Sequence, residues 1–314
     1  MFGLRDITNA KLRIKPGKPV TQVVTSQPVV APPIVSKASY DIDLPPRPSD
    51  PLSVYAQDIY NYLREWEQRT HPHPRYLDKQ PELNADTRAV VIDWMVEIHS
   101  RFQSVPESIF TAVNYLDRFL SQKVVVRQKL QLVAYACLFL ACKFEDIYTP
   151  RLKHWLKIVS PQIMKADLLR AERLLCTTLD FAMAVPSAFT FLRRFTKIAG
   201  ADTFVKYSAH FLIEYSLTES DILHHYPSAQ AAAALIVCSE LFNGNRESWP
   251  RDLEQYSGYS RHELEPAIAF MKRNLSESVK SHVYNGKPRS AIYKKYATEP
   301  YNYISLEVRK KLIV

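Results

Sequence analysis

Apolar residues recur at the three- and four-residue spacing of amphipathic helices from about Arg88 to about residue 280. No stretch alternates apolar and polar residues for long enough to predict a strand. The first two apolar stripes are Val91, Trp94, Met95, Ile98 and Phe102, followed by Ile109, Val113, Leu116 and Leu120. The pattern therefore predicts an all-α protein built from consecutive helices with short connections.

Two segments are apolar on every side instead of on one face. Residues Leu132 to Cys142 and Ala231 to Cys238 contain no charged side chain, and only a helix enclosed by other helices tolerates such a surface in water. Each segment is flanked by amphipathic stretches, including helices expected near 150–159 and 166–179 in the first half. The two segments lie about a hundred residues apart in matching places, which predicts a duplicated five-helix bundle.

The ends of the chain follow other patterns. Residues 1–48 are rich in Pro and lack helical periodicity, which predicts a disordered regulatory tail. Asp50-Pro51 is a good helix start. We therefore expect an N-terminal helix over 49–70, a first bundle over 85–184, a second bundle over 185–280 and a C-terminal extension over 281–314. Ser260 and Glu263 have the spacing of a capping box and should open the last helix of the second bundle.

Composition excludes several classes of function. The chain has 6 Gly and neither common phosphate-binding glycine motif, which disfavours a nucleotide-binding enzyme. Its 4 Cys show no C-x-x-C spacing, so we expect no zinc or other metal site. No apolar run approaches the ~20 residues that span a bilayer, and the His and carboxylate residues form no catalytic spacing. We expect a soluble intracellular protein that is not an enzyme and needs no cofactor.

The net charge of +9 is concentrated in both tails, with Lys11, Arg13, Lys15 and Lys18 near the start and Lys294, Lys295, Arg309, Lys310 and Lys311 near the end. Such clusters suit either solvated tails or acidic partners. Lys143 is a more specific candidate than these clusters, because it directly follows the most apolar helix. A buried cation there needs an anionic partner or a route to water, and residue spacing alone does not identify that partner.

Four segments carry a family resemblance: Thr87 to Val96, Tyr115 to Leu120, Lys129 to Leu132 and Lys143 to Asp146. Together they resemble the cyclin box, and the likeness extends over about residues 50 to 300. The hallmark positions of that box are filled here by Arg88, Asp117, Leu132, Lys143 and Glu172. The chain is thus similar to cyclins, which are all-α regulatory subunits of cyclin-dependent protein kinases with two tandem boxes.

The resemblance implies roles for particular residues. Arg88 should form an ion pair with Asp117 inside the first bundle. Lys143 and Glu172 should bind the N-lobe helix of the kinase and its flanking loop. Leu140, Phe144 and Phe181 would supply apolar anchors around that grip. Activation would be allosteric, since a partner that binds the active arrangement better shifts the kinase toward it.

A second implied site is a shallow docking patch for Arg-x-Leu motifs of substrates or inhibitors. It would consist of Val90, Val91, Trp94 and Gln131, with Glu97 placed to meet the docking arginine. Thr87 stands where the family usually has Met, so we expect weaker docking. The same spacing on any amphipathic helix also fits ordinary core packing.

The second half of the chain resembles B-type cyclins more than A-type cyclins in Phe191 to Arg194, His225 to Ser228 and Tyr256 to Tyr259. B-type cyclins have a phosphate pocket of Arg, His and Lys. Here Arg193 matches, but Lys206 and His210 are exchanged. Residues four apart on a helix share a face, so the charge and donor set can survive the exchange, and solvated basic residues fit these positions equally well.

The N-terminus resembles the destruction box of mitotic cyclins. Leu4, Ile7 and Asn9 match that motif, but Met1 occupies the place of its arginine. We therefore expect a degenerate degron, recognised by the ubiquitin ligase that degrades mitotic cyclins. Phosphoproteins are further expected partners, and shuttling between nucleus and cytoplasm is the expected localisation.

Three alternatives remain at this point: an A-type cyclin, a transcriptional cyclin, and a nucleic-acid-binding transcription factor core with two cyclin-like bundles. The last class usually carries an N-terminal zinc ribbon, which the Cys pattern excludes. Binding to nucleic acid or to a membrane is therefore not expected. The favoured prediction is a B-type mitotic cyclin that controls the G2/M transition.

Overall fold

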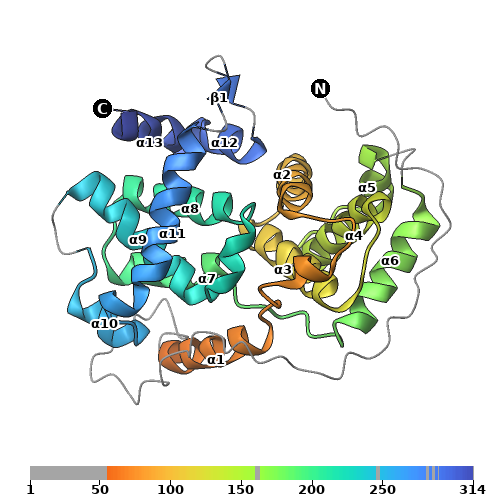
Figure 1. Cartoon of the computed structure of the whole chain (residues 1–314), viewed down its shortest axis with the longest axis horizontal. Helices are drawn as coiled ribbons and strands as arrows, with labels where there is room; N and C mark the ends of the chain where they lie inside the picture. The colour runs from red at the N-terminus through yellow and green to blue at the C-terminus, as the bar shows by residue number, and fades with distance from the viewer. Residues whose placement is uncertain are drawn as a thin grey trace. The chain divides into compact units, whose positions relative to one another are not determined.

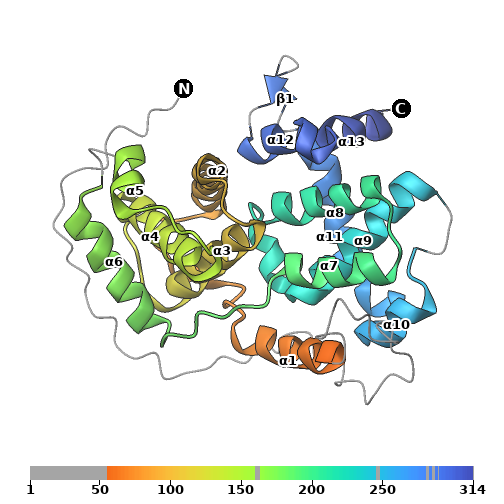
Figure 2. The ribbon, with the colours of Figure 1, turned by 180° about the vertical axis from the view of Figure 1, so that it is seen from behind.

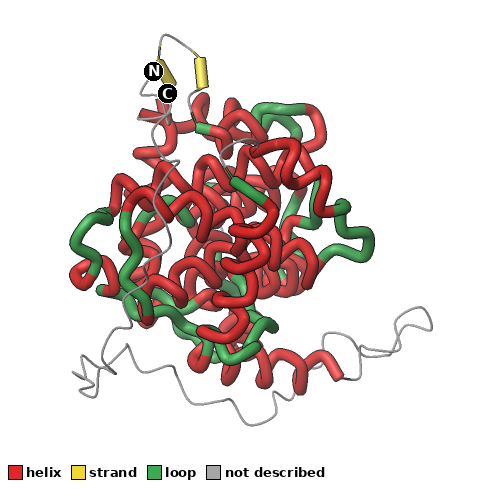
Figure 3. The backbone as a smooth tube through the Cα atoms, turned by 90° about the vertical axis from the view of Figure 1, so that its right-hand side faces the viewer, coloured by secondary structure: helices red, strands yellow, loops and turns green. Residues whose placement is uncertain are grey.

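The computed structural model describes residues 55–159, 163–244, 248–280, 283–284, 287–288 and 290–313. Most of these residues are helical (Figure 3), as the spacing of apolar residues predicts. They divide into two compact units. The first unit contains His71–Val185 and Leu217–Leu223, and the second contains the described parts of Val29–Thr70, Pro186–Ser216 and His224–Val314.

The first unit is built around one buried helix, α4 (Arg127–Glu145). It packs against α2 (Ala85–Phe102), α3 (Pro106–Gln122) and α6 (Lys165–Thr178) (Figure 1). The short helix α5 (Leu152–Val159) adds Trp155, whose ring contacts those of Tyr135 and Phe139 on α4. Every residue from Leu132 to Cys142 is buried, which confirms the prediction of an enclosed helix.

Local sequence accounts for the start of two of the neighbouring helices, α2 and α3. Asn84 and Thr87 form a capping box at α2, because the Asn84 side chain accepts from the Thr87 N–H and the Thr87 hydroxyl accepts from the Asn84 N–H, both at 2.9 Å. Pro106 occupies the first turn of α3, where its missing N–H would have no helical partner. A short 3-10 helix, η2 (Tyr76–Lys79), precedes α2 and contacts α3.

The second unit repeats this plan around α9 (Pro227–Asn243). Helices α7 (Ala188–Ile198), α8 (Thr203–Ser216) and α11 (Arg261–Lys280) pack against it (Figure 2). Ala231 to Cys238 are all buried, which again confirms the sequence prediction. Ser260 and Glu263 form the expected capping box, with the Ser260 N–H donating to the Glu263 carboxylate at 2.8 Å. A connection of this unit contains α10 (Arg251–Ser257), while η3 (Ser220–His224) belongs, except for His224, to the first unit.

The C-terminal extension contains structure that periodicity did not predict. It has two antiparallel strands of two residues each, β1 (Val283–Tyr284) and β2 (Lys287–Pro288), followed by α12 (Ala291–Tyr296), η4 (Glu299–Tyr301) and α13 (Ile304–Ile313). Helices α12 and α13 pack against α8. Glu214 on α8 accepts from the Lys295 Nζ and the Tyr296 hydroxyl, each at 2.8 Å. Strands and helices this short carry too few residues to show a period.

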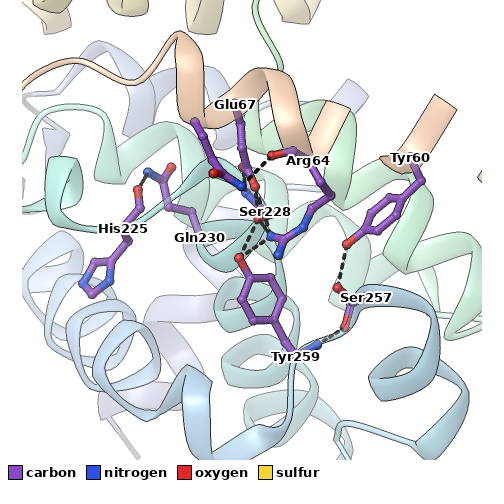
Figure 4. Close-up of polar contacts among 9 residues, drawn as sticks. Tyr60, Arg64, Glu67, His225, Ser228, Gln230, Ser257 and Tyr259 are labelled. Atoms are coloured by element: carbon purple, nitrogen blue, oxygen red, sulfur yellow. Dashed lines mark hydrogen bonds and ion pairs between the residues drawn. The ribbon is translucent and has the colours of Figure 1, made fainter. Parts of the chain in front are cut away.

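The N-terminal helix α1 (Ala56–Arg69) belongs to the second unit. Its expected start at Asp50-Pro51 lies outside the described residues. Arg64 and Glu67 on α1 meet Ser228 and Tyr259 in a buried polar network (Figure 4). Tyr60 adds a hydrogen bond from its hydroxyl to the Ser257 carbonyl at 3.0 Å. Helix α1 is thus fixed to its unit by polar contacts.

Candidate functional site

Lys143 and Glu172 form an ion pair on the surface of the first unit. Lys143 lies in the last turn of α4 and Glu172 lies on α6, and these helices pack together. The Lys143 side chain is 42% exposed and that of Glu172 is 14% exposed. Glu172 therefore supplies the anionic partner that Lys143 requires, while the ammonium keeps contact with water.

Several contacts hold this end of α4 in place. The Lys143 ammonium lies 5.1 Å from the centre of the Phe139 ring, and a cation is attracted to the face of an aromatic ring. Glu145 accepts from the Thr111 hydroxyl at 2.7 Å, and Asp146 accepts from the Val105 N–H at 3.0 Å. Lys143 also lies near the negative end of the helix dipole, which favours a cation.

The three expected apolar anchors differ in exposure. Phe144 and Phe181 have 49% and 69% of their surface exposed, whereas Leu140 is buried in the bundle. Large exposed aromatic side chains beside an ion pair are typical of protein interfaces. Two of the three expected anchors are therefore exposed, whereas Leu140 lies in the core.

A tight turn after α6 presents Phe181. Asp180 and Phe181 have φ values of 50° and 53°, in the left-handed region that is unfavourable for a bulky residue. The following carbonyls are fixed by the bundle, since Arg118 donates to the Ala182 carbonyl at 2.8 Å and Tyr115 donates to the Met183 carbonyl at 2.7 Å. These hydrogen bonds stabilise the turn despite its strain.

Arg88 and Asp117 form the buried ion pair that the resemblance implies. The guanidinium donates to both carboxylate oxygens at 2.8 and 2.7 Å, and both side chains are 2% exposed. Tyr76 donates to Asp117 at 2.7 Å, and Arg88 donates to the Leu217 carbonyl at 2.8 Å. Burial alone would lower the pKa of Arg88, but the Asp117 carboxylate more than offsets this and raises the pKa. The pair is structural.

A groove of about 170 Å³ lies between α2 and α4. Its lining includes Val90, Val91, Trp94 and Gln131 of the expected docking patch, together with Asp86, Thr87, Arg127 and Leu130. Glu97 does not line the groove, and its carboxylate pairs with Arg101 at 2.6 Å. A docking role of Glu97 stays a prediction. The structure thus brings four of the five patch residues together and adds two charged residues.

The phosphate pocket differs from the sequence expectation. Arg193 and Lys206 are exposed, but His210 is 7% exposed and contacts Phe189, with ring centres 4.9 Å apart and ring planes tilted by 41°. Burial, and next the Lys206 charge, lower the pKa of His210 to about 4. His210 is therefore buried in the second unit and not exposed like the other two residues, and the phosphate pocket stays a prediction. Two cations remain at the surface of the expected pocket.

Sequence reasoning did not predict the exposure of two apolar sets. Ile147 and Tyr148 follow α4 and are about nine-tenths exposed, while Tyr55, Ile59 and Tyr62 form an exposed stripe on α1. Helical spacing identifies Tyr55 and Ile59 as part of an apolar stripe but does not show whether that stripe is buried, and no pattern marks the pair in the loop. The degron residues Leu4, Ile7 and Asn9 lie outside the described residues.

The described residues contain neither a membrane-spanning helix nor a metal-binding cluster. None of their helices is both long and apolar enough to cross a membrane. Within the same residues, His, Cys, Asp and Glu side chains form no cluster of three that could hold a metal ion.

Comparison with known proteins gives a consistent picture. Residues 58–184 match the cyclin N-terminal domain and residues 186–310 match the cyclin C-terminal domain. The chain is 37% identical over 263 residues to the G2/mitotic-specific cyclin cdc13 of Schizosaccharomyces pombe, which covers 83% of this chain and 52% of that protein. It is 34% identical over 263 residues to the G2/mitotic-specific cyclin-B of Emericella nidulans, with coverage of 83% and 53%.

Other relatives agree. Cyclin-A1 of Mus musculus is 37% identical over 261 residues, covering 82% of this chain and 60% of that protein. A viral cyclin from herpesvirus saimiri has the same fold, with a TM-score of 0.63 at 20% identity over 70% of this chain and 97% of that one. The chain spans about half the length of the two fungal relatives. Both domain matches and these identities show that the chain belongs to the cyclin family.

Proposed function

We propose that this chain is the regulatory subunit of a mitotic cyclin-dependent protein kinase, which it binds and activates allosterically. The observation that carries the proposal is the Lys143–Glu172 pair, with Phe144 and Phe181 exposed. An ion pair this exposed contributes only about 0–1 kcal/mol to folding. We therefore assign the ion pair, and the exposed rings of Phe144 and Phe181, to binding of the kinase instead of to stability of the fold.

The geometry accounts for the binding step. Lys143 has three donor hydrogens and gives one bond to Glu172, so further donors are available for carbonyl groups of the kinase. Glu172 fixes the direction of the ammonium before binding, which lowers the entropy lost in the complex. Phe144 and Phe181 add apolar area that is removed from water.

Activation requires no reacting group on this chain. A subunit that contacts the active arrangement of the kinase more extensively than the inactive one shifts the population toward the active form. Catalysis then belongs to the kinase, and the role of this chain is regulatory. We assign it to control of G2/M progression, because relatives at 34–37% identity include G2/mitotic-specific cyclins.

The finer assignments belong to the same proposal. We assign the chain to the B-type on its second-half motifs, although relatives of both A and B types are similar to it. Docking of substrates or inhibitors is assigned to the groove between α2 and α4. Recognition by a ubiquitin ligase, binding of phosphoproteins, and shuttling between nucleus and cytoplasm complete the proposed role.

The test combines Lys143→Ala with Glu172→Ala. We expect the helical circular dichroism to be unchanged, and kinase pull-down and histone phosphorylation to fall by more than a hundredfold. A matched control is Lys310→Ala with Glu307→Ala, which removes another exposed ion pair in the second unit and should leave activation intact. Normal kinase activation by the Lys143/Glu172 double variant would refute the proposed binding site.

A further inference from the structure

The loop between α4 and α5 contains a threonine directly followed by a proline. Asp146 to Arg151 form neither helix nor strand. Within this loop, Ile147 and Tyr148 are about nine-tenths exposed and directly precede Thr149 and Pro150. A residue before proline is held away from the helical region and toward an extended backbone. Pro150 therefore favours an extended backbone at Thr149, beside two exposed side chains.

The Thr149 hydroxyl has one weak contact. It lies 3.5 Å from the Cys142 carbonyl in the last turn of α4, beyond the usual range of about 2.5–3.0 Å between two oxygens. The same carbonyl accepts from the Asp146 N–H at 3.0 Å. Thr149 is half-buried, and release of its hydroxyl leaves the Cys142 carbonyl satisfied. A modifying enzyme can therefore engage this hydroxyl without breaking a strong interaction.

Basic side chains follow the loop. Arg151, Lys153 and Lys157 are exposed, and none of their side chains forms an ion pair or hydrogen bond with another described residue. The first turn of α5 contains no acidic side chain. Arg151 and Lys153 thus place two cations at the positive end of a helix, which is unfavourable. An anion beside them would offset both the two cations and the helix dipole.

We propose that Thr149 is a phosphorylation site for a proline-directed protein kinase, and that its phosphate pairs with Arg151 and Lys153 at the start of α5. The proline-directed class recognises a proline directly after the modified residue. In the transfer, the Thr149 Oγ1 forms a bond to the γ-phosphorus of ATP, the bond from that phosphorus to the β–γ bridging oxygen breaks, and ADP leaves. The hydroxyl proton passes to a base of the modifying kinase.

Phosphorylation moves the loop away from α4. The phosphate dianion has no hydrogen to donate to the Cys142 carbonyl, and the negative end of α4 and the Asp146 carboxylate repel it. Arg151 and Lys153 attract it through charge-assisted hydrogen bonds. Because the loop directly follows Phe144, phosphorylation weakens binding of the cyclin-dependent kinase. This regulatory step rests on the proposed function, whereas the phosphorylation site itself does not.

The first test treats the full chain with ATP and a purified mitogen-activated protein kinase, which is proline-directed, and maps the product by mass spectrometry. We expect stoichiometric phosphate on Thr149, none at this position in Thr149→Val, and much slower labelling in Pro150→Ala. Ser160-Pro161 is the other Ser-Pro or Thr-Pro pair of the chain, so Ser160→Ala is the matched control and should keep phosphate on Thr149. An unmodified Thr149 in the folded chain would overturn the proposal.

Phosphorus NMR then locates the phosphate. Neighbouring cations stabilise the dianion and lower the second pKa of a phosphate. We expect this pKa to be lower in the folded chain than in the urea-unfolded chain, to rise in Arg151→Gln and in Lys153→Gln, and to stay low in Lys157→Gln. Lys157 is a matched control because it lies one turn further along α5. The same pKa in the wild type and all three variants would overturn the pairing with α5.

Calorimetric titration with a catalytically inactive cyclin-dependent kinase measures the regulatory step. Phosphate on Thr149 should weaken binding about three- to tenfold, as surface charges allow, and Thr149→Val should keep the affinity of the untreated chain. Unchanged affinity at stoichiometric phosphorylation would overturn the regulation and leave the proposed function intact. If the untreated chain did not bind the kinase, the proposed function would fail, while mass spectrometry and the phosphorus pKa would still decide the phosphorylation site.

Discussion

Phe181 combines an unfavourable backbone with an exposed side chain. A bulky residue in the left-handed region destabilises the fold by about 1–3 kcal/mol. Because the Phe181 ring is exposed, its packing offsets little of this strain. The turn is held by Arg118 and Tyr115 through the carbonyls of Ala182 and Met183. Strain of this kind persists where the surrounding structure over-determines the turn, so it is consistent with a binding role for the ring.

We therefore predict opposite effects of Phe181→Gly on stability and on binding. Glycine adopts positive φ without strain, so the free energy of unfolding should stay unchanged or rise by up to about 1 kcal/mol. Kinase affinity should fall by more than tenfold, because the ring is lost. Urea unfolding and calorimetric titration measure the two quantities. Asp180→Gly relaxes the neighbouring strained residue and should leave affinity unchanged; a large stability loss in Phe181→Gly would contradict a binding role.

His210 illustrates what a neighbouring element does to one side chain. Its pKa is lowered to about 4 by burial and then by Lys206, with Lys295 and Arg193 acting in the same direction and Glu214 opposing them. Between about pH 4 and pH 6.5, His210 is therefore neutral in the folded protein but protonated in the unfolded chain. Above this range the side chain is neutral in both states and stability is unaffected. Because proton binding favours the unfolded chain, stability is lost as the pH falls from 6.5 toward 4.

We predict that His210→Gln reduces the acid sensitivity of the fold. Between pH 7 and pH 4.5, the wild-type protein should lose about 2–3 kcal/mol more unfolding free energy than the variant, from a shift of this size. Urea unfolding at each pH gives both values, and the other titrating groups cancel in the difference. Parallel pH profiles for the two proteins would show that His210 is protonated in the folded state.

At the scale of elements, α1 buries two charged residues beside one aromatic residue, Tyr60, whose ring packs against other rings of the second unit. The apolar stripe of Tyr55, Ile59 and Tyr62 on α1 is exposed, whereas Arg64 and Glu67 are buried. Arg64 donates to Glu67 at 3.0 Å and also contacts Ser228 and the Tyr259 ring, while the Ser228 N–H donates to Glu67 at 2.9 Å (Figure 4). Burial raises the pKa of Glu67 to about 7, and the Arg64 charge opposes this.

We predict that Arg64→Ala detaches α1 from its unit. Breaking a buried ion pair leaves an uncompensated charge and costs about 3–5 kcal/mol. The unfolding free energy should fall by this amount, and α1 should lose hydrogen-exchange protection. Arg64→Met with Glu67→Leu should be much less destabilising, because it leaves no unpaired charge. The control is Glu65→Ala, which breaks an exposed pair with Arg69 on the same helix and should cost less than about 1 kcal/mol. Equal losses of unfolding free energy in Arg64→Ala and Glu65→Ala would exclude a special role for the buried network.

The buried face of α1 could not be predicted from spacing. An amphipathic pattern identifies an apolar stripe, and the usual expectation is that the stripe faces the core. Here Arg64, Glu67, Ser228 and Tyr259 satisfy one another, and a satisfied polar group can be buried. Ser228 and Tyr259 lie more than 160 residues from Arg64 along the chain, so no local pattern contains this information.

At the scale of the whole molecule, the two central helices were the most predictable feature. Leu132 to Cys142 and Ala231 to Cys238 are apolar on all sides, and each lies at the centre of its own unit. Their sequence admits few other environments in water. The C-terminal extension was the least predictable part, because short helices such as α12 depend on contacts with α8 rather than on periodicity.

The two units are not simple consecutive halves. Leu217–Leu223 belongs to the first unit although it follows α8 of the second. Within the first unit this segment supplies the Leu217 carbonyl that accepts from Arg88, and the Leu223 carbonyl that lies 2.8 Å from the His71 ring. A boundary drawn at residue 185 by sequence pattern therefore separates residues that fold together.

The sequence by itself determined the helical class and the duplicated bundle, while only its resemblance to cyclins implied the Lys143–Glu172 pair. These features depend on apolar spacing and on residue identity, which are local properties of the chain. Only the tertiary structure decided that His210 and Leu140 are buried, that Phe181 stands in a strained turn, and that Asp86 and Arg127 line the same groove. Burial and charge pairing depend on which distant elements meet, and that information exists only once the chain has folded.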